Sequence, residues 1–92
     1  MELKDFTGKP CRAKVAYEFL PNKKIKLNLE KLESIIEEKF AIEIKSRILL
    51  IIKVGDKTVS LFESGKLLVR GERDEVAAKE IANQIVKLIP ND

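Results

Sequence analysis

The stretch VSLFESGKLLVRG, residues 59–71, predicts the hairpin around which the rest of this chain is organised. Its alternating apolar and polar residues predict two antiparallel strands, and Gly65 suits the positive φ that the tight turn between them requires. The core face of this hairpin is expected to carry Leu61, Leu67 and Val69. The opposite face is expected to carry Phe62, Leu68 and Arg70. Because the opposite face combines a large aromatic side chain with a charge, we take it as the candidate functional surface.

Further strands are predicted just before this hairpin. Residues 42–54 are rich in β-branched side chains and predict one long strand, or two pieces with a break near residues 45–46. Residues 55–56, a Gly-Asp pair, supply a two-residue hairpin turn. We therefore expect three consecutive antiparallel strands joined by short turns. The core face of the first of them is expected to carry Ile48, Leu50, Ile52 and Val54.

Two amphipathic helices are also predicted. Asn28 is a good N-cap, because its side-chain oxygen can accept a hydrogen bond from a free amide of the first turn, and Asp74 can do the same for the second helix. Apolar residues recur at helical spacing behind each cap, and the first helix is expected to end near Lys39. Its glutamates are interpreted as a solvated face rather than a metal or acid-base site. Pro90 ends the second helix.

The order of these elements predicts the fold class and the domain organisation. Residues 12–20 alternate like a half-buried strand, with Tyr17 and Phe19 on the core side. The chain then reads strand, helix, three or four strands, helix, which predicts an α+β fold with both helices on one face of an antiparallel sheet. Residues 1–11 show little periodicity and are expected to be a loosely held lead-in to a single domain over residues 12–92.

The composition excludes several classes of function. The chain has 92 residues, one cysteine and no histidine, so neither an internal disulfide nor the usual zinc site is expected, and no cofactor is indicated.

Its longest apolar run, residues 48–52, is too short to span a membrane, and no signal-peptide pattern is present, so we expect a cytoplasmic protein. Charged residues make up 36%, mostly lysine and glutamate, a bias typical of thermophile proteins. The net charge of +3 is compatible with a polyanionic partner.

The sheet face opposite the helices is expected to be both apolar and basic. A solvated face does not usually carry several large apolar side chains, so such a patch indicates an interface. The apolar members expected there are Leu49, Ile51, Phe62 and Leu68. The basic members are Arg12, Lys14, Arg47, Lys53 and Arg70. Three interpretations stay open: a nucleic acid binds this face, another chain covers it, or strand curvature buries it within the domain.

The hairpin also resembles a segment of a known family. Residues 61–71, LFESGKLLVRG, followed by a capped helix that contains alanines, resemble one repeat of the TATA-box-binding protein family, in which Ile-Phe-x-Ser-Gly-Lys-x-Val-x-Thr-Gly precedes the last helix. The order of strands and helices over residues 12–89 is similar to that repeat as well. The resemblance implies a sheet that binds and bends double-stranded DNA through the minor groove. It also implies that Phe62 wedges between base pairs and that Leu68 lies against the groove floor.

The chain departs from the family's pattern at several positions. It contains one repeat, so a saddle made of two repeats requires a homodimer. Arg70 stands where the family has threonine, and the position of the family's second wedging phenylalanine falls near Lys45. The first hypothesis is therefore a module that binds DNA as a homodimer.

The second hypothesis is a protein-interaction or self-assembly module that binds no nucleic acid. In that case the apolar members of the face form the core of a protein interface, and the basic members form its rim. An enzyme is the weakest hypothesis, because the chain has no histidine, no Gly-rich phosphate loop and no nucleophile with an evident base. Cys11, between Lys9 and Arg12, is interpreted as an incidental cysteine rather than a reactive thiol.

Overall fold

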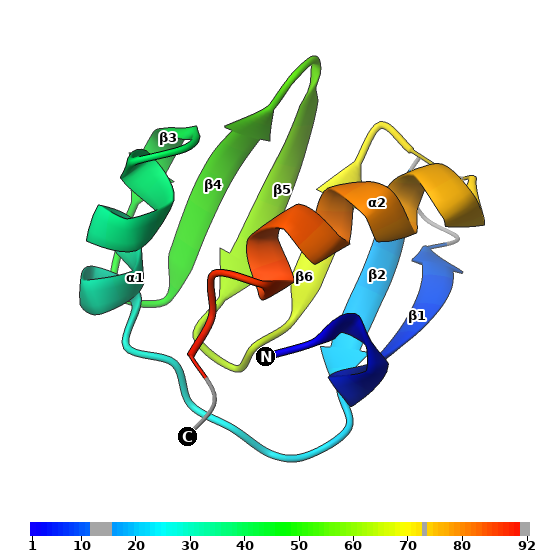
Figure 1. Ribbon diagram of the computed structural model, residues 1–92, viewed down its shortest axis with the longest axis horizontal. Helices are drawn as coiled ribbons and strands as arrows, with labels where there is room; N and C mark the ends of the chain where they lie inside the picture. Colours follow the sequence, from blue (N-terminus) through cyan, green and yellow to red (C-terminus); the bar gives the residue numbers. More distant parts are fainter. Residues whose placement is uncertain (12–15, 73, 91–92) are drawn as a thin grey trace.

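The computed structural model describes residues 1–11, 16–72 and 74–90. The strands are β1 (Phe6–Cys11), β2 (Ala16–Pro21), β3 (Ala41–Lys45), β4 (Leu49–Val54), β5 (Lys57–Phe62) and β6 (Leu67–Arg70), and the helices are α1 (Leu29–Glu37) and α2 (Glu75–Val86), with a short 3-10 helix at Leu3–Asp5. All six strands form one antiparallel sheet in the order β1-β2-β6-β5-β4-β3, and both helices lie over one face of it (Figure 1). The predicted α+β fold is confirmed.

Both helices begin at the predicted caps. The Asn28 side chain accepts a hydrogen bond from the Lys31 amide at the start of α1, and the Asp74 side chain accepts one from the Ala77 amide at the start of α2. α1 packs on β3 and β4, and α2 packs on β2 and β6. The buried residues are Leu29, Leu32 and Ile36 in α1, and Ala78, Ala82, Ile85 and Val86 in α2. No helix in the part of the chain that the structure describes is long and apolar enough to cross a membrane.

The predicted hairpins form the centre of the sheet. β4 and β5 are joined through Gly55, which has a φ of 62°, and β5 and β6 are joined through Gly65, which has a φ of 91°. This left-handed conformation costs a residue with a side chain about 1–2 kcal/mol, which explains glycine at both turns. Leu61, Leu67 and Val69 are all fully buried on the helix side of the sheet, as the alternation predicts.

Residues 1–11 are not a loosely held lead-in. Residues 6–11 form β1, which pairs with β2 at one edge of the sheet, and Phe6 is buried in the core. Gly8 is paired with Phe19 of β2, and its backbone lies so close to the Phe19 ring that an added Cβ would be 2.8 Å from Cε1. The Met1 amino group donates a hydrogen bond to the Ile89 carbonyl beyond α2. The sequence does not predict this strand, because its order comes from pairing and packing rather than from an alternating pattern.

Residues 42–54 form two strands, which is the second of the two predicted arrangements. β3 and β4 pair with each other as a hairpin whose register is interrupted by a bulge. Between them the Ser46 hydroxyl accepts hydrogen bonds from the amides of Ile48 and Leu49 and closes a tight turn. Ile48 therefore belongs to the turn and is 66% exposed, so its predicted place in the core is wrong. The other three residues predicted for that face, Leu50, Ile52 and Val54, are buried.

Candidate functional site

The sheet has one face that neither helix covers, and we call it the open face (Figure 1). Three rows of side chains cross it, because residues paired between neighbouring strands point to the same face. The basic row contains, from β3 to β2, Ala41, Lys53, Thr58, Arg70 and Ala16. The middle row contains, from β3 to β1, Ile44, Ile51, Ser60, Leu68, Glu18 and Lys9. The end row contains Leu49 and Phe62.

Most of the residues predicted for the functional surface are brought together on this face. They are Leu49, Ile51, Lys53, Phe62, Leu68 and Arg70. The alternation of each strand was enough to predict this grouping, since the turns between the strands keep all of them in register. Two further predicted residues, Arg12 and Lys14, lie outside the residues that the structure describes.

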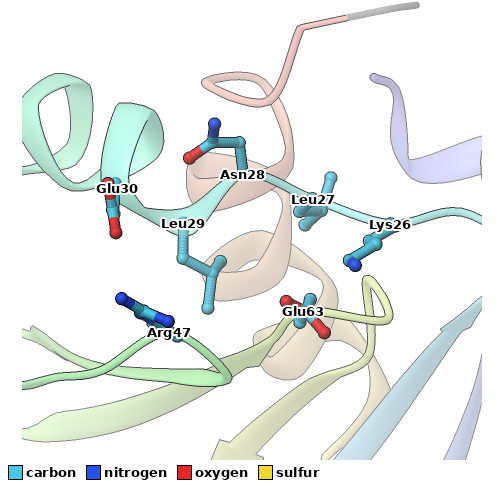
Figure 2. Close-up of a pocket in the computed structure, with 7 residues that line it drawn as sticks. All are labelled: Lys26, Leu27, Asn28, Leu29, Glu30, Arg47 and Glu63. Atoms are coloured by element: carbon cyan, nitrogen blue, oxygen red, sulfur yellow. The ribbon is translucent and has the colours of Figure 1, made fainter.

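Arg47 does not lie on the open face, so its predicted placement is wrong. β4 begins only at Leu49, and Arg47 belongs to the turn before it. Its side chain lines a cavity of about 440 Å³ at the amino end of α1, where Figure 2 shows it on the sheet side with Glu30 on the helix side. Lys26 and Glu63 line the same cavity, so positive and negative side chains are mixed there. This charge pattern does not favour a ligand of either sign.

The middle of the open face is partly covered by its own side chains. Leu68 is only 7% exposed, and Ser60 and Ala16 are fully buried, although no helix lies above them. Phe62, Leu49 and Ile51 are half-buried. Ile44, at the β3 end of the middle row, is 50% exposed. The apolar side chains of the open face are therefore accessible mainly toward β3.

Arg70 lies across the open face and holds a defined position. Its Nε donates a hydrogen bond to the Ser60 hydroxyl oxygen over 3.3 Å, across the paired strands β5 and β6. Because Ser60 is fully buried, its hydroxyl oxygen is shielded from water by the protein. A guanidinium has five N–H donors, and this contact uses only one of them. Among the described residues, the Arg70 guanidinium donates such a bond only through Nε, so its terminal amino groups can donate to a ligand.

At the other end of the face, the Lys66 ammonium lies between the Phe62 ring and the Glu18 carboxylate, which neutralises its charge. The Lys66 ammonium lies 5.3 Å from the centre of the Phe62 ring, a cation–π contact, and 3.5 Å from a carboxylate oxygen of Glu18. Glu18 is on β2, opposite Leu68 in the pairing of β2 with β6. The free protein thus covers the Phe62 ring with Lys66 and offsets the charge of Lys66 with Glu18.

The shifted pKa values and the acidic groups do not indicate catalysis or a metal site. The hydrogen bond with Glu37 raises the pKa of Lys45, with a further contribution from Glu33, and contact with Glu75 raises the pKa of Lys79. These lysines bind glutamates of the two helices rather than groups on the open face, which is typical of structural ion pairs. Among residues 1–11, 16–72 and 74–90, no group of histidine, cysteine or acidic residues could hold a metal ion.

Comparisons of the chain with protein-family models, with curated proteins and with solved structures found no match. Among the polar residues of the open face, Glu18, Thr58 and Ser60 neighbour its cations but are not predicted as functional from the sequence. The strand alternation assigns them to this face, but only the pairing of β2, β5 and β6 shows which cations they meet.

Proposed function

We propose that the protein is a non-catalytic module that binds double-stranded DNA on the open face of its sheet. The observation that carries this proposal is that half-buried apolar side chains and exposed cations share one face without a helix over it. Phe62 and Ile51 supply apolar contact, and Lys53 and Arg70 supply positive charge. The resemblance of residues 61–71 to the TATA-box-binding protein repeat supports the same partner and gives Phe62 the role of a wedge.

The proposed complex balances two opposing terms. Inserting an aromatic wedge between base pairs costs a few kcal/mol of unstacking, which contacts between cations and phosphates offset. If Lys9, Lys53 and Arg70 each neutralise one phosphate, the logarithm of the affinity falls with the logarithm of the salt concentration with a slope of about −2.7. Raising the salt fourfold then weakens binding about 40-fold.

Titration of a labelled duplex by fluorescence anisotropy tests the wedge. Phe62→Ala is expected to weaken binding about tenfold, because the stacking contact is lost, and to leave the salt slope unchanged. Phe40→Ala is the matched control, since Phe40 is also half-buried but packs against the core cluster that contains the helix residues. Equal losses in the two variants, each confirmed as folded by circular dichroism, would show that Phe62 is not a wedge.

A second candidate function is a protein interface, favoured by the exposure of apolar side chains near β3. Ile44 in β3 is 50% exposed, and Ile48 in the turn after β3 is 66% exposed, so exposed apolar surface continues from the sheet edge into this turn. In this function the chain assembles or binds a protein and has no duplex affinity at physiological salt. Ile48→Asp is then expected to dissociate the assembly, whereas Val76→Asp, a control at a 65% exposed position on α2, is not. Analytical ultracentrifugation separates these outcomes.

The homodimer is a separate part of the DNA-binding proposal. The free edges of the sheet are β1, which carries Lys9 and Pro10, and β3, which is bulged. Lysine, proline and bulges at an edge all oppose strand pairing between copies. We therefore expect a monomer in the absence of DNA and two copies side by side on a duplex. A stable dimer measured without DNA would contradict this arrangement.

A further inference from the structure

We propose that Lys53, Thr58 and Arg70 form a phosphate-binding site in the basic row, in which Ser60 positions the Arg70 guanidinium. The inference rests on the proposed function only for the identity of the natural ligand, a phosphate of the DNA backbone. The site itself follows from the strand register, the hydrogen bond to Arg70 and the distribution of acidic side chains. Thr58 and Ser60 are additions to the residues that the sequence marks as functional.

The register places three suitable side chains next to one another. Lys53 on β4 is paired with Thr58 on β5, and Thr58 is paired with Arg70 on β6. Neighbouring strands are about 4.8 Å apart, so the backbones of the two cations are about 10 Å apart with a hydroxyl between them. Long side chains from both sides can reach one phosphate at that separation, and the hydroxyl can donate a hydrogen bond to it from below.

The hydrogen bond to Ser60 prepares Arg70 for bidentate binding. It occupies Nε at 3.3 Å and leaves the two terminal amino groups, which form the fork that binds phosphate oxygens. Ser60 is fully buried on a central strand although it faces the open side of the sheet, so neighbouring side chains rather than solvent surround its hydroxyl oxygen. A guanidinium held in this way loses less conformational freedom when the ligand binds.

The distribution of acidic side chains leaves the positive charge of the basic row available to a ligand. Among the described residues, no carboxylate lies within ion-pair distance of Lys53 or Arg70. Lys66, at the other end of the face, is already paired with Glu18. Phosphates should therefore lie along the basic row, near the β4–β5 hairpin, and at Lys9 on the β1 edge, whereas apolar or base contacts should lie along the end row and the rest of the middle row.

Nuclear magnetic resonance can test the site without any nucleic acid. The labelled protein is titrated with inorganic phosphate at constant ionic strength, and the side-chain Nε–H signals of both Arg70 and Arg47 are followed. Arg47 is a built-in control, because it is also exposed but lies in the β3–β4 turn. A saturating shift at Arg70 and none at Arg47 is expected. Equal shifts, or a shift at Arg70 that does not saturate, would overturn the proposal.

Variants separate the positioning role of Ser60 from the general charge of the face. Ser60→Ala keeps every charge and is expected to weaken phosphate binding about threefold to tenfold, by the net contribution of a hydrogen bond. Arg70→Lys also keeps the charge but removes the fork, so its loss should be similar or larger. Lys53→Gln should weaken binding, whereas Lys39→Gln, at an exposed position after α1, should not. Wild-type affinity in both Ser60→Ala and Arg70→Lys would overturn the proposal.

Duplex titrations of the same samples distinguish the two proposals. A saturating, Arg70-specific phosphate shift in a protein that binds no duplex at any salt concentration would refute the proposed function and support the site. Duplex binding by the wild type, combined with no specific phosphate shift and unchanged duplex affinity in Ser60→Ala, would refute the site and support the function.

Discussion

Replacement of Gly8 by alanine tests whether β1 is an integral part of the sheet. Gly8 lies opposite Phe19 in β2, and an added Cβ would lie 2.8 Å from Phe19 Cε1 and 2.9 Å from Tyr17 Cε1. Both rings belong to the buried core, where Phe19 is 1% exposed and Tyr17 is 5% exposed, and their centroids are 5.2 Å apart. Because the rings are enclosed, neither can move aside without disturbing the core around it.

Two opposing terms set the size of the effect. Overpacking a well-filled core costs about 1–3 kcal/mol, whereas replacing glycine by alanine recovers about 0.4–1 kcal/mol by restricting the unfolded chain. The steric term wins, and we expect a net loss of about 1–2 kcal/mol in the free energy of unfolding. For a domain of this size the melting temperature should fall by about 5–15 °C.

Urea unfolding followed by circular dichroism measures this loss directly. Lys9→Ala is the control, since it also changes β1 but at an exposed position, and it should alter stability by less than about 0.5 kcal/mol. Amide hydrogen exchange should show reduced protection in β1 and β2 of the Gly8→Ala variant. A Gly8→Ala variant as stable as the wild type would show that β1 is not closely packed against the aromatic pair.

Two further predictions concern ionic contacts. Glu18→Gln should free Lys66 for one more phosphate, which raises duplex affinity and steepens the salt slope by about 0.9 in anisotropy titrations, and affinity at or below that of the wild type would contradict this role. The pKa of Lys45 is raised, first by its hydrogen bond with Glu37, so its stabilising contribution is complete below the ordinary value of 10.5 and is lost as the pH rises through the folded-state pKa. Lys45→Met should therefore flatten the alkaline decline of the melting temperature, and an unchanged decline would show that this pair does not contribute.

The sequence predicts the parts of this protein that depend on local patterns. The alternation in residues 59–71 correctly separates Leu61 and Leu67 on the core face from Phe62 and Leu68 on the open face. The helix caps are likewise local, because each side chain bonds an amide three residues ahead. Local patterns fail where the chain turns: Arg47 and Ile48 continue the alternation of β4 in the sequence, but a hydroxyl at Ser46 closes a turn there.

Contacts between residues far apart in the sequence depend on how the whole chain folds. β1 has no pattern of its own and is ordered because it pairs with β2 and because Gly8 fits beneath Phe19. The ion pair between Glu18 and Lys66 requires β2 and β6 to be neighbours in the sheet, although β2 is near the start of the chain and β6 is its last strand. The alternation of single strands determines which face a side chain occupies. Which side chains meet on that face, and so where its charge is available, depends on the pairing of strands, which the hydrophobic pattern alone leaves open.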